Sequence, residues 1–354
     1  WVTAAENSTK GGPFFGCNDN GTGAAVAENS SWHGTQTTGI LGAATNNATG
    51  MAGSAYDVPV IAARALGKCG GYDSDIIAAA EWSGGIAVSG VPANAHPVRV
   101  INMSLGSSDV CSQAYVDALT LLRNKGVFVV VAAGNDEGLA VDTPANCKPA
   151  ATDGDQTPVV IAVAGLRHAG TKVGFSDIGP EVTLSAPGGN CVNTSGACLY
   201  PILTTTNTGA QGPGTATYSD GLNNPSLGTS FATPLVAGTV ALMLSAAPNL
   251  SNAQVIGLLK QTARPFPTTS DSSPQPPVCT VPASGSTTVQ DECICTTSTC
   301  GAGMLDAGAA VTAAAALSTG TPPTAAVASP TATVAVGSTV TLDGSSSTLG
   351  TGSG

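Results

Sequence analysis

The chain has 354 residues, of which 9% are charged and 42% hydrophobic, and its formal net charge is −11. This length can bury one large core or two medium ones, and the apolar content argues against disorder along most of the chain. The negative charge would repel nucleic acid and anionic membrane surfaces. No apolar run reaches the roughly 18 residues of a membrane span. For these two reasons, neither nucleic acid nor a membrane is expected as a partner.

After a polar, glycine-rich stretch at residues 1–32, apolar strands and helices are expected to alternate. The expected strands cover residues 58–66, 98–105, 127–135, 158–166 and 182–188. The expected helices cover residues 74–85 with Ser74 as N-cap, 112–126 ending at Gly126, 229–246, and 252–262 capped by Ser251. Strands that are apolar throughout, with helices between them, predict an α/β fold with a central parallel sheet covered on both faces.

Ten cysteines are spread along the chain without the paired spacing and histidines of a zinc site. We therefore expect disulfides formed in an oxidising compartment, and a secreted protein follows from them. Cys191 and Cys198 are near enough in sequence to close a local loop. Residues 265–300, rich in Pro, Ser, Thr and Cys, are expected to form a loop held by disulfides, whose pairing the sequence does not determine. Residues 318–330 are expected to form a linker.

Three histidines are available as a general base, and two of them, His96 and His168, are interpreted as surface residues or residues with their own polar partners. His33 opens the segment HGTQTTGILGA, whose small residues predict a tightly packed helix start. Ser230, in GTSFATPLVAG, is either a helix cap or a nucleophile placed where unpaired N–H groups and the helix dipole stabilise an oxyanion. Pro234 is expected in the first turn of this helix, where a missing N–H costs nothing.

Asn135 ends the apolar segment VVVAAGN, at the carboxyl end of an expected strand. It is either a turn former or an amide donor to the same oxyanion, because ligand sites of open parallel sheets lie at the carboxyl ends of the strands.

The segments HGTQTTGILGA, NMSLGSS, VVVAAGN and GTSFATPLVAG resemble, in this order, the motifs of the subtilisin-like serine proteases, the subtilases, over roughly residues 30 to 317. The resemblance is closest to secreted bacterial members with extra disulfides. It implies a subtilisin-like three-layer fold and a serine endopeptidase that acts through an acyl-enzyme, with Ser230 as nucleophile, His33 as general base and Asn135 as oxyanion donor.

The same resemblance implies a monomer that binds an extended polypeptide substrate along two segments lining the first specificity pocket. These segments consist of Ser104, Leu105 and Gly106, and of Ala132, Ala133 and Gly134. Gln36 stands where the motif usually has a second histidine, at a position without a chemical role.

The family's aspartate, which normally follows an apolar strand before the histidine, has no counterpart upstream of His33. Asp19 is the only aspartate there, and no apolar strand precedes it. We therefore expect residues 1–317 to form a catalytic domain without its first core strand. Such a chain should be very weakly active, since the imidazole lacks its orienting carboxylate.

Residues 44–53 resemble the calcium loop of the family, and a plain glycine turn is the alternative. The resemblance implies weak structural Ca²⁺ binding by the side chain of Asn47 and the main-chain carbonyls of Thr45, Thr49 and Met51. Thr143-Pro144 resembles a pocket wall in which the proline is often cis.

Asp142, just before this wall, is either a surface carboxylate or a group near the pocket floor that favours a basic P1 residue. Residues 301–311 resemble the closing helix of the family. Residues 331–354 resemble the start of a truncated PKD-type β-sandwich, a domain that often attaches to polymeric substrates.

Two other functions are considered. A secreted non-catalytic pseudoprotease would use the same fold to present a peptide-binding cleft. The serine-carboxyl peptidases share the GTS serine, but they would have a glutamate in place of His33 and an aspartate in place of Asn135.

Overall fold

The computed structural model describes residues 30–67, 70–191, 199–209, 212–219, 226–283 and 285–318. The expectations for Asp19, for the Cys198 loop and for residues 319–354 lie outside these ranges.

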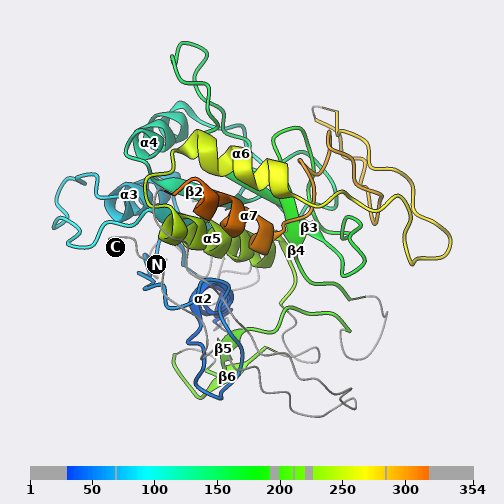
Figure 1. Cartoon of the computed structure of the whole chain (residues 1–354), viewed down its shortest axis with the longest axis horizontal. Coiled ribbons are helices and arrows are strands. Elements are labelled where there is room, and N and C mark those ends of the chain that lie inside the picture. Colours follow the sequence, from blue (N-terminus) through cyan, green and yellow to red (C-terminus); the bar gives the residue numbers. More distant parts are fainter. Residues whose placement is uncertain are drawn as a thin grey trace, which may run out of the picture.

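A four-stranded parallel sheet forms the centre of the molecule (Figure 1). Its strands, in spatial order, are β1 (Val100–Met103), β2 (Phe128–Ala132), β3 (Ile161–Leu166) and β4 (Leu184–Pro187). Each of them lies inside a range predicted from the sequence. Val130 of β2 is in register with Asn102 of β1 and with Ile161 of β3, so β2 is paired on both sides.

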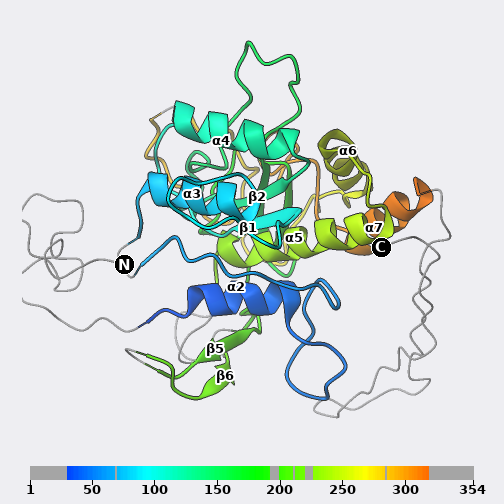
Figure 2. The ribbon, with the colours of Figure 1, turned by 90° about the vertical axis from the view of Figure 1, so that its left-hand side faces the viewer.

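Helices lie on both sides of this sheet (Figure 2). Their bounds are α2 (His33–Gly42), α3 (Asp73–Ser83), α4 (Gln113–Asn124), α5 (Thr229–Ala246), α6 (Asn252–Thr262) and α7 (Ala307–Ala316). One face of the sheet packs against α5, α6 and α7, and the other against α3 and α4. The predicted three-layer α/β arrangement is therefore confirmed.

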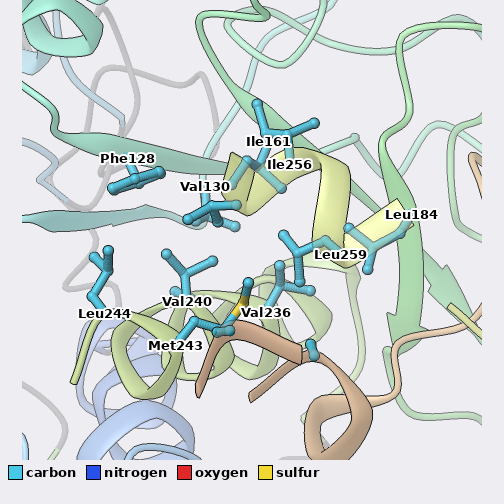
Figure 3. Close-up of a cluster of buried hydrophobic side chains, with 14 of the residues drawn as sticks. Phe128, Val130, Ile161, Leu184, Val236, Val240, Met243, Leu244, Ile256 and Leu259 are labelled. Carbon is cyan, nitrogen blue, oxygen red and sulfur yellow. The ribbon is translucent and has the colours of Figure 1, made fainter. Parts of the chain in front are cut away.

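Alternation along β2 explains how one strand serves two cores. Phe128 and Val130 pack with residues of α5, α6 and α7 (Figure 3), whereas Val129 and Val131 pack with residues of α3 and α4. All four side chains are at most 1% exposed. Because successive strand residues point to opposite faces, a strand covered on both faces must be apolar at every position.

The long helix α5 is the central element of the first core. It contacts all four strands of the sheet as well as α2 and α7. Within the described ranges it is the one helix long and apolar enough to cross a membrane, with a mean hydropathy of 1.4, and 72% of it is buried inside the protein.

Helix starts follow the sequence signals in one case and depart from them in another. Ser251 caps α6 as predicted: its hydroxyl accepts from the Gln254 N–H, and the Gln254 side chain accepts from the Ser251 N–H. The prediction of Ser74 as the cap of α3 is wrong, because that helix already begins at Asp73, with Tyr72 as its N-cap. Aspartates in the first turn of α3 favour this start through the helix dipole.

The strand predicted at residues 58–66 is not formed. Val60 and Ile61 are 40% and 38% exposed, and no described strand lies beside the segment. An extended segment becomes a strand only when its backbone groups find a partner, and its apolar sequence cannot supply one. A short hairpin of β5 (Thr205–Asn207) and β6 (Ala216–Tyr218) was not predicted.

Disulfides hold the loop at residues 265–300, as expected. Two bonds lie within it, Cys279–Cys293 and Cys295–Cys300. A third bond, Cys111–Cys147, joins the start of α4 to the segment after β2. Cys191 is also disulfide-bonded.

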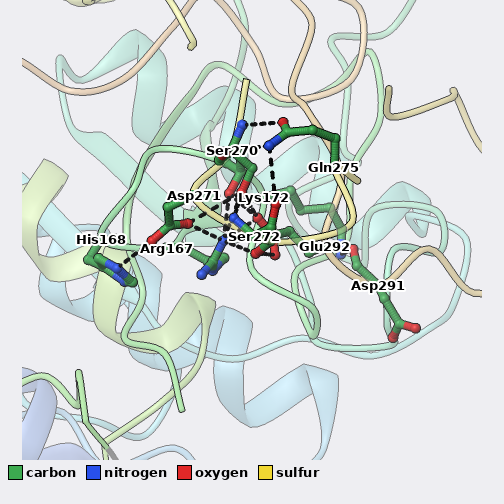
Figure 4. Close-up of polar contacts among 10 residues, drawn as sticks. Arg167, His168, Lys172, Ser270, Asp271, Ser272, Gln275, Asp291 and Glu292 are labelled. Carbon is green, nitrogen blue, oxygen red and sulfur yellow. Dashed lines mark hydrogen bonds and ion pairs between the residues drawn. The ribbon is translucent and has the colours of Figure 1, made fainter. Parts of the chain in front are cut away.

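A polar network centred on the buried Arg167 docks this loop against the end of β3 (Figure 4). The Arg167 guanidinium pairs with Asp271 at 3.1 Å and with Glu292. His168 Nε2 lies 3.2 Å from Asp271 Oδ2, which agrees with its interpretation as a residue with its own partner. The Lys172 ammonium is fully buried and donates to four main-chain carbonyls, so its charge is held by peptide dipoles.

Candidate active site

Ser230 lies in the first turn of α5, one residue after the helix begins, and is 8% exposed. The turn starts from Gly228, whose φ of 147° is readily adopted only by glycine. Phe231 N donates to Gly228 O at 3.0 Å, whereas the Ser230 N–H has no intrahelical acceptor at this position. Hydroxyl and unpaired N–H groups thus meet at the positive end of the helix dipole.

Pro234 lies in the second turn of α5, so its expected place in the first turn is wrong. A proline there leaves the carbonyl of residue 230 without its usual N–H donor. The Ser104 hydroxyl donates to this carbonyl at 2.6 Å, and Asn102 Nδ2 donates to the Ser104 hydroxyl at 3.0 Å. The end of β1 thereby fixes the backbone of Ser230 from outside the helix.

Asn135 follows β2, and its side chain is oriented by the start of α5. Its Oδ1 accepts from the backbone N–H of Thr229 at 2.9 Å and from the Thr229 hydroxyl at 3.1 Å. Since only the oxygen accepts, the Nδ2 group points away from Thr229 and remains available as a donor. A Cβ built on Gly228 would lie 3.5 Å from Asn135 Oδ1 and 3.7 Å from Ser230 N, so the amide and this N–H border the same space.

His33 is the first residue of α2, which packs along α5 (Figure 2). Trp32, with φ 55°, caps the helix, and its ring nitrogen donates to Gly209 O at 2.7 Å. The His33 ring meets the Phe231 ring edge-on with centroids 5.6 Å apart, so it lies next to the residue that follows Ser230. Burial lowers the pKa of His33.

Within the described ranges, no hydrogen bond joins the Ser230 hydroxyl to the His33 ring, and no carboxylate pairs with that ring. The structure therefore brings the serine, histidine and asparagine motifs to one place without showing a closed hydrogen-bond chain.

The two expected pocket segments leave the sheet side by side. Residues 104–106 follow β1 and residues 132–134 end β2, and these strands are paired in register. A third segment joins them: Asp142 N donates to Ala133 O at 2.8 Å, and Thr143 and Ser107 exchange backbone hydrogen bonds of 2.9 and 3.0 Å. The Thr143-Pro144 bond is cis, as the resemblance implied.

Asp142 is buried rather than on the surface, so the first of its two interpretations is wrong. It is 8% exposed, and its carboxylate lies between the pocket segments. A Cβ built on Gly106 would lie 3.0 Å from Asp142 Oδ2, and one on Gly134 would lie 2.8 Å from the same oxygen. Burial raises the pKa of Asp142 to about 7, and the charges of Asp177 and Asp136 raise it further against the opposing effect of the Ser108 hydroxyl.

Asp136 and Asp177 were not singled out from the sequence. One oxygen from each of Asp136, Asp142 and Asp177 lies within 4.8 Å of the others. Burial also raises the pKa of Asp177, to about 6, although the Asp136 and Leu139 backbone N–H groups donate to its carboxylate. The position of Asp136 directly after Asn135 was an available signal, whereas Asp177 is far away in sequence.

The expected calcium loop has a backbone that turns repeatedly. Asn46, Ala48 and Gly50 have φ of 58°, 57° and 66°, and these residues alternate with the predicted ligands. Asn47 Oδ1 accepts from Thr49 N at 3.0 Å, which leaves one lone pair. The loop offers an amide oxygen and three carbonyls, fewer than the six or more oxygens that Ca²⁺ takes. The residues fit part of a site.

The sequence of this chain is similar to those of known proteins. The family model described as "Subtilase family" matches residues 5–298. An extracellular protease of Xanthomonas campestris pv. campestris is 41% identical over 308 residues, 86% of this chain and 44% of that protein. An extracellular basic protease of Dichelobacter nodosus is 40% identical over 222 residues, 62% of this chain and 32% of that protein.

A solved structure shows the same fold. The protease of Pseudoalteromonas arctica PAMC 21717 matches with a TM-score of 0.65 and 38% identity, over 82% of this chain and 73% of that one. The chain spans less than half of the length of the Xanthomonas and Dichelobacter proteases.

Proposed function

The chain belongs to the subtilase family, and on that basis we propose that it is the catalytic region of a secreted serine endopeptidase. The observation that carries the proposal is the orientation of Asn135. Its oxygen is held by Thr229, so its N–H₂ group is free to donate beside the Ser230 N–H. Two fixed donors next to a serine hydroxyl suit the oxyanion of an acyl-transfer reaction.

In the proposed reaction, Ser230 Oγ attacks the carbonyl carbon of the scissile peptide bond while the His33 ring takes the hydroxyl proton. The developing oxyanion accepts hydrogen bonds from Asn135 Nδ2 and Ser230 N. His33 then returns the proton to the leaving amine, which gives an acyl-enzyme. Water, activated by the same ring, hydrolyses the ester and regenerates Ser230.

The lowered pKa of His33 supports its role as a base, because only the neutral imidazole accepts a proton. We place the carboxylate that orients this ring outside the described residues, since no described carboxylate pairs with it. A subtilisin that lacks its aspartate loses about 3 × 10⁴-fold in kcat, so a chain without this group would be very slow.

The substrate would be an extended polypeptide that pairs with residues 104–106 as an added strand. These residues follow β1 and lie next to the anchored carbonyl of Ser230, so such a strand would run past the hydroxyl. Secretion is proposed because the relatives from Xanthomonas and Dichelobacter are named extracellular proteases and because disulfides hold the fold.

A serine-directed fluorophosphonate tests the proposal on the whole protein. We expect covalent labelling that Ser230→Ala abolishes. Ser83→Ala is the control, because its hydroxyl only bonds to Ala79 O within α3 at 2.7 Å. Absence of labelling in the wild-type protein, together with retained peptide binding, would instead show a non-catalytic peptide-binding protein.

Structural calcium is a separate proposal for the loop at residues 45–51. Because the loop supplies only part of a coordination shell, we expect a dissociation constant of about 10⁻³ M or weaker. Titration calorimetry with CaCl₂ measures it, with Asn47→Ala as the comparison. Tight binding that Asn47→Ala leaves unchanged would mean that this loop is not the site.

A further inference from the structure

One oxygen of Asp142 is buried without a hydrogen-bond partner. Its Oδ1 is inaccessible to solvent and bonds to nothing in the part of the chain that the structure describes. Leaving such an oxygen unpaired is costly, and the cost grows when the group is charged. This oxygen can therefore accept a hydrogen bond from a donor that a bound molecule supplies.

The charge around Asp142 specifies what kind of donor is missing. The oxygens of Asp136 and Asp177 converge on it within 4.8 Å, and none of the three carboxylates forms an ion pair with a described cationic side chain. The nearby Lys172 ammonium is already bound to four main-chain carbonyls. The Asp142 oxygen therefore favours a donor that carries positive charge.

The carboxylates of Asp177 and Asp136 are held in place by other contacts. Asp177 accepts from the backbone N–H groups of Asp136 and Leu139, each at 3.0 Å. Asp136 Oδ2 accepts from the Ser108 hydroxyl at 2.6 Å. These two carboxylates are anchored and add to the negative potential at Asp142. Asp142 is the one of the three with a buried oxygen, Oδ1, that has no hydrogen-bond partner among the described residues.

The location of Asp142 indicates where the cation comes from. Its carboxylate packs against Gly106 and Gly134, whose lack of side chains leaves room for it between the two segments. Its backbone is hydrogen-bonded to Ala133, and the next residue to Ser107, so it is fixed to both walls. A substrate side chain bound between these walls would therefore lie next to the carboxylate.

We infer that Asp142, reinforced by Asp136 and Asp177, selects substrates with an arginine or lysine side chain at P1, the residue whose carbonyl is attacked. The inference rests on the proposed function, because it takes residues 104–106 and 132–134 as the walls of the first specificity pocket. A guanidinium offers paired N–H donors that match one carboxylate, and burial strengthens this pairing.

The test compares peptide substrates that differ only at P1, with Arg, Lys, Leu or Glu, cleaved by the whole protein. We expect kcat/KM for Arg and Lys to exceed that for Leu by at least about 10-fold, since charged pairs discriminate strongly in desolvated sites. Asp142→Asn keeps the shape and removes the charge, and it should lower the Arg/Leu ratio by about 10-fold or more. Asp117→Asn, an exposed carboxylate on α4, should leave the ratio unchanged.

A second measurement does not depend on catalysis. Benzamidine carries an arginine-like amidinium, and we expect calorimetry to detect its binding to the Ser230→Ala protein and its loss when Asp142→Asn is added. If Asp142→Asn does not fold, the binding of benzamidine to the Ser230→Ala protein alone decides.

The outcomes separate the two proposals. Fluorophosphonate labelling together with equal cleavage after Leu and Arg would overturn the basic preference and leave the protease proposal standing. No labelling with retained benzamidine binding would overturn the protease proposal and leave Asp142 as the binding site of a basic side chain rather than as a P1 selector. Binding of CaCl₂ that Asp142→Asn abolishes would assign the three carboxylates to a metal ion and overturn the inference.

Discussion

Replacing Asp142 with asparagine should stabilise the protein at alkaline pH, although it removes the group that we assign to substrate selection. The pKa of Asp142 is raised from 3.8 to about 7, mainly by burial. Between these two values the folded chain keeps a proton that the unfolded chain has released. This retained proton stabilises the folded chain. The free energy of unfolding therefore falls as pH rises through this window, and the stabilisation by the proton is lost above about pH 7.

The width of this window, about three pH units, corresponds to about 4 kcal/mol at about 1.4 kcal/mol per unit. Part of the rise in pKa comes from the charge of Asp177, which itself titrates at about pH 6. We therefore expect Asp142→Asn to raise the free energy of unfolding by about 2–4 kcal/mol at pH 8 and by almost nothing at pH 4.

Urea unfolding followed by tryptophan fluorescence between pH 4 and pH 8 measures this difference. All variants should carry Ser230→Ala, so that self-digestion does not interfere. Asp117→Asn is the matched control, since it removes an exposed carboxylate on α4. A stability difference between Asp142→Asn and its parent that stays constant across this pH range would refute the reasoning.

Four further predictions concern other parts of the molecule. Asn135→Asp keeps an acceptor for Thr229 but removes the amide donor, so kcat should fall by about 10²–10³-fold; an unchanged kcat would assign the asparagine to structure alone. The pH profile of kcat/KM should rise through a pKa below 6.5, because burial lowers the pKa of His33, and a midpoint above 7 would contradict this. Cys279→Ser opens a loop of 14 residues and should cost about 3 kcal/mol in urea unfolding; a loss below about 1 kcal/mol would mean that the loop is held by its other contacts. Glu292→Gln removes a charge that faces the Arg167 guanidinium, which is only 6% exposed, and should lower the free energy of unfolding by about 2–3 kcal/mol. No change would mean that Asp271 alone is a sufficient partner for Arg167.

Much of the layered fold could be predicted because local patterns agree with it. The continuous apolar run around Val130 predicts a strand covered on both faces, and the structure buries every residue of β2. Ser251 and Gln254 form the capping box that marks the start of α6. Such signals depend on a few neighbouring residues, so they can be found in the sequence.

Features that depend on a partner far away in the chain could not be predicted. Residues 58–66 have the composition of a strand, but their pairing depends on another segment. The hydrogen bond from Ser104 to the Ser230 carbonyl, which compensates for the proline, joins positions 126 residues apart, and the grouping of Asp142 with Asp177 results from the packing of two loops. In these cases the sequence shows which types of residue are present, but it does not show that they lie close together in the folded chain.

The proline in α5 has a mechanical consequence. An ordinary helix would satisfy the carbonyl of residue 230 with its own next turn, and the serine would then move only with the helix. Here that oxygen is tethered to Ser104 at the rim of the β-sheet, so a peptide that displaces the rim would pull on the backbone beside the reactive hydroxyl. In the proposed protease, a peptide paired with residues 104–106 would therefore act on the position of the attacking oxygen through this one hydrogen bond.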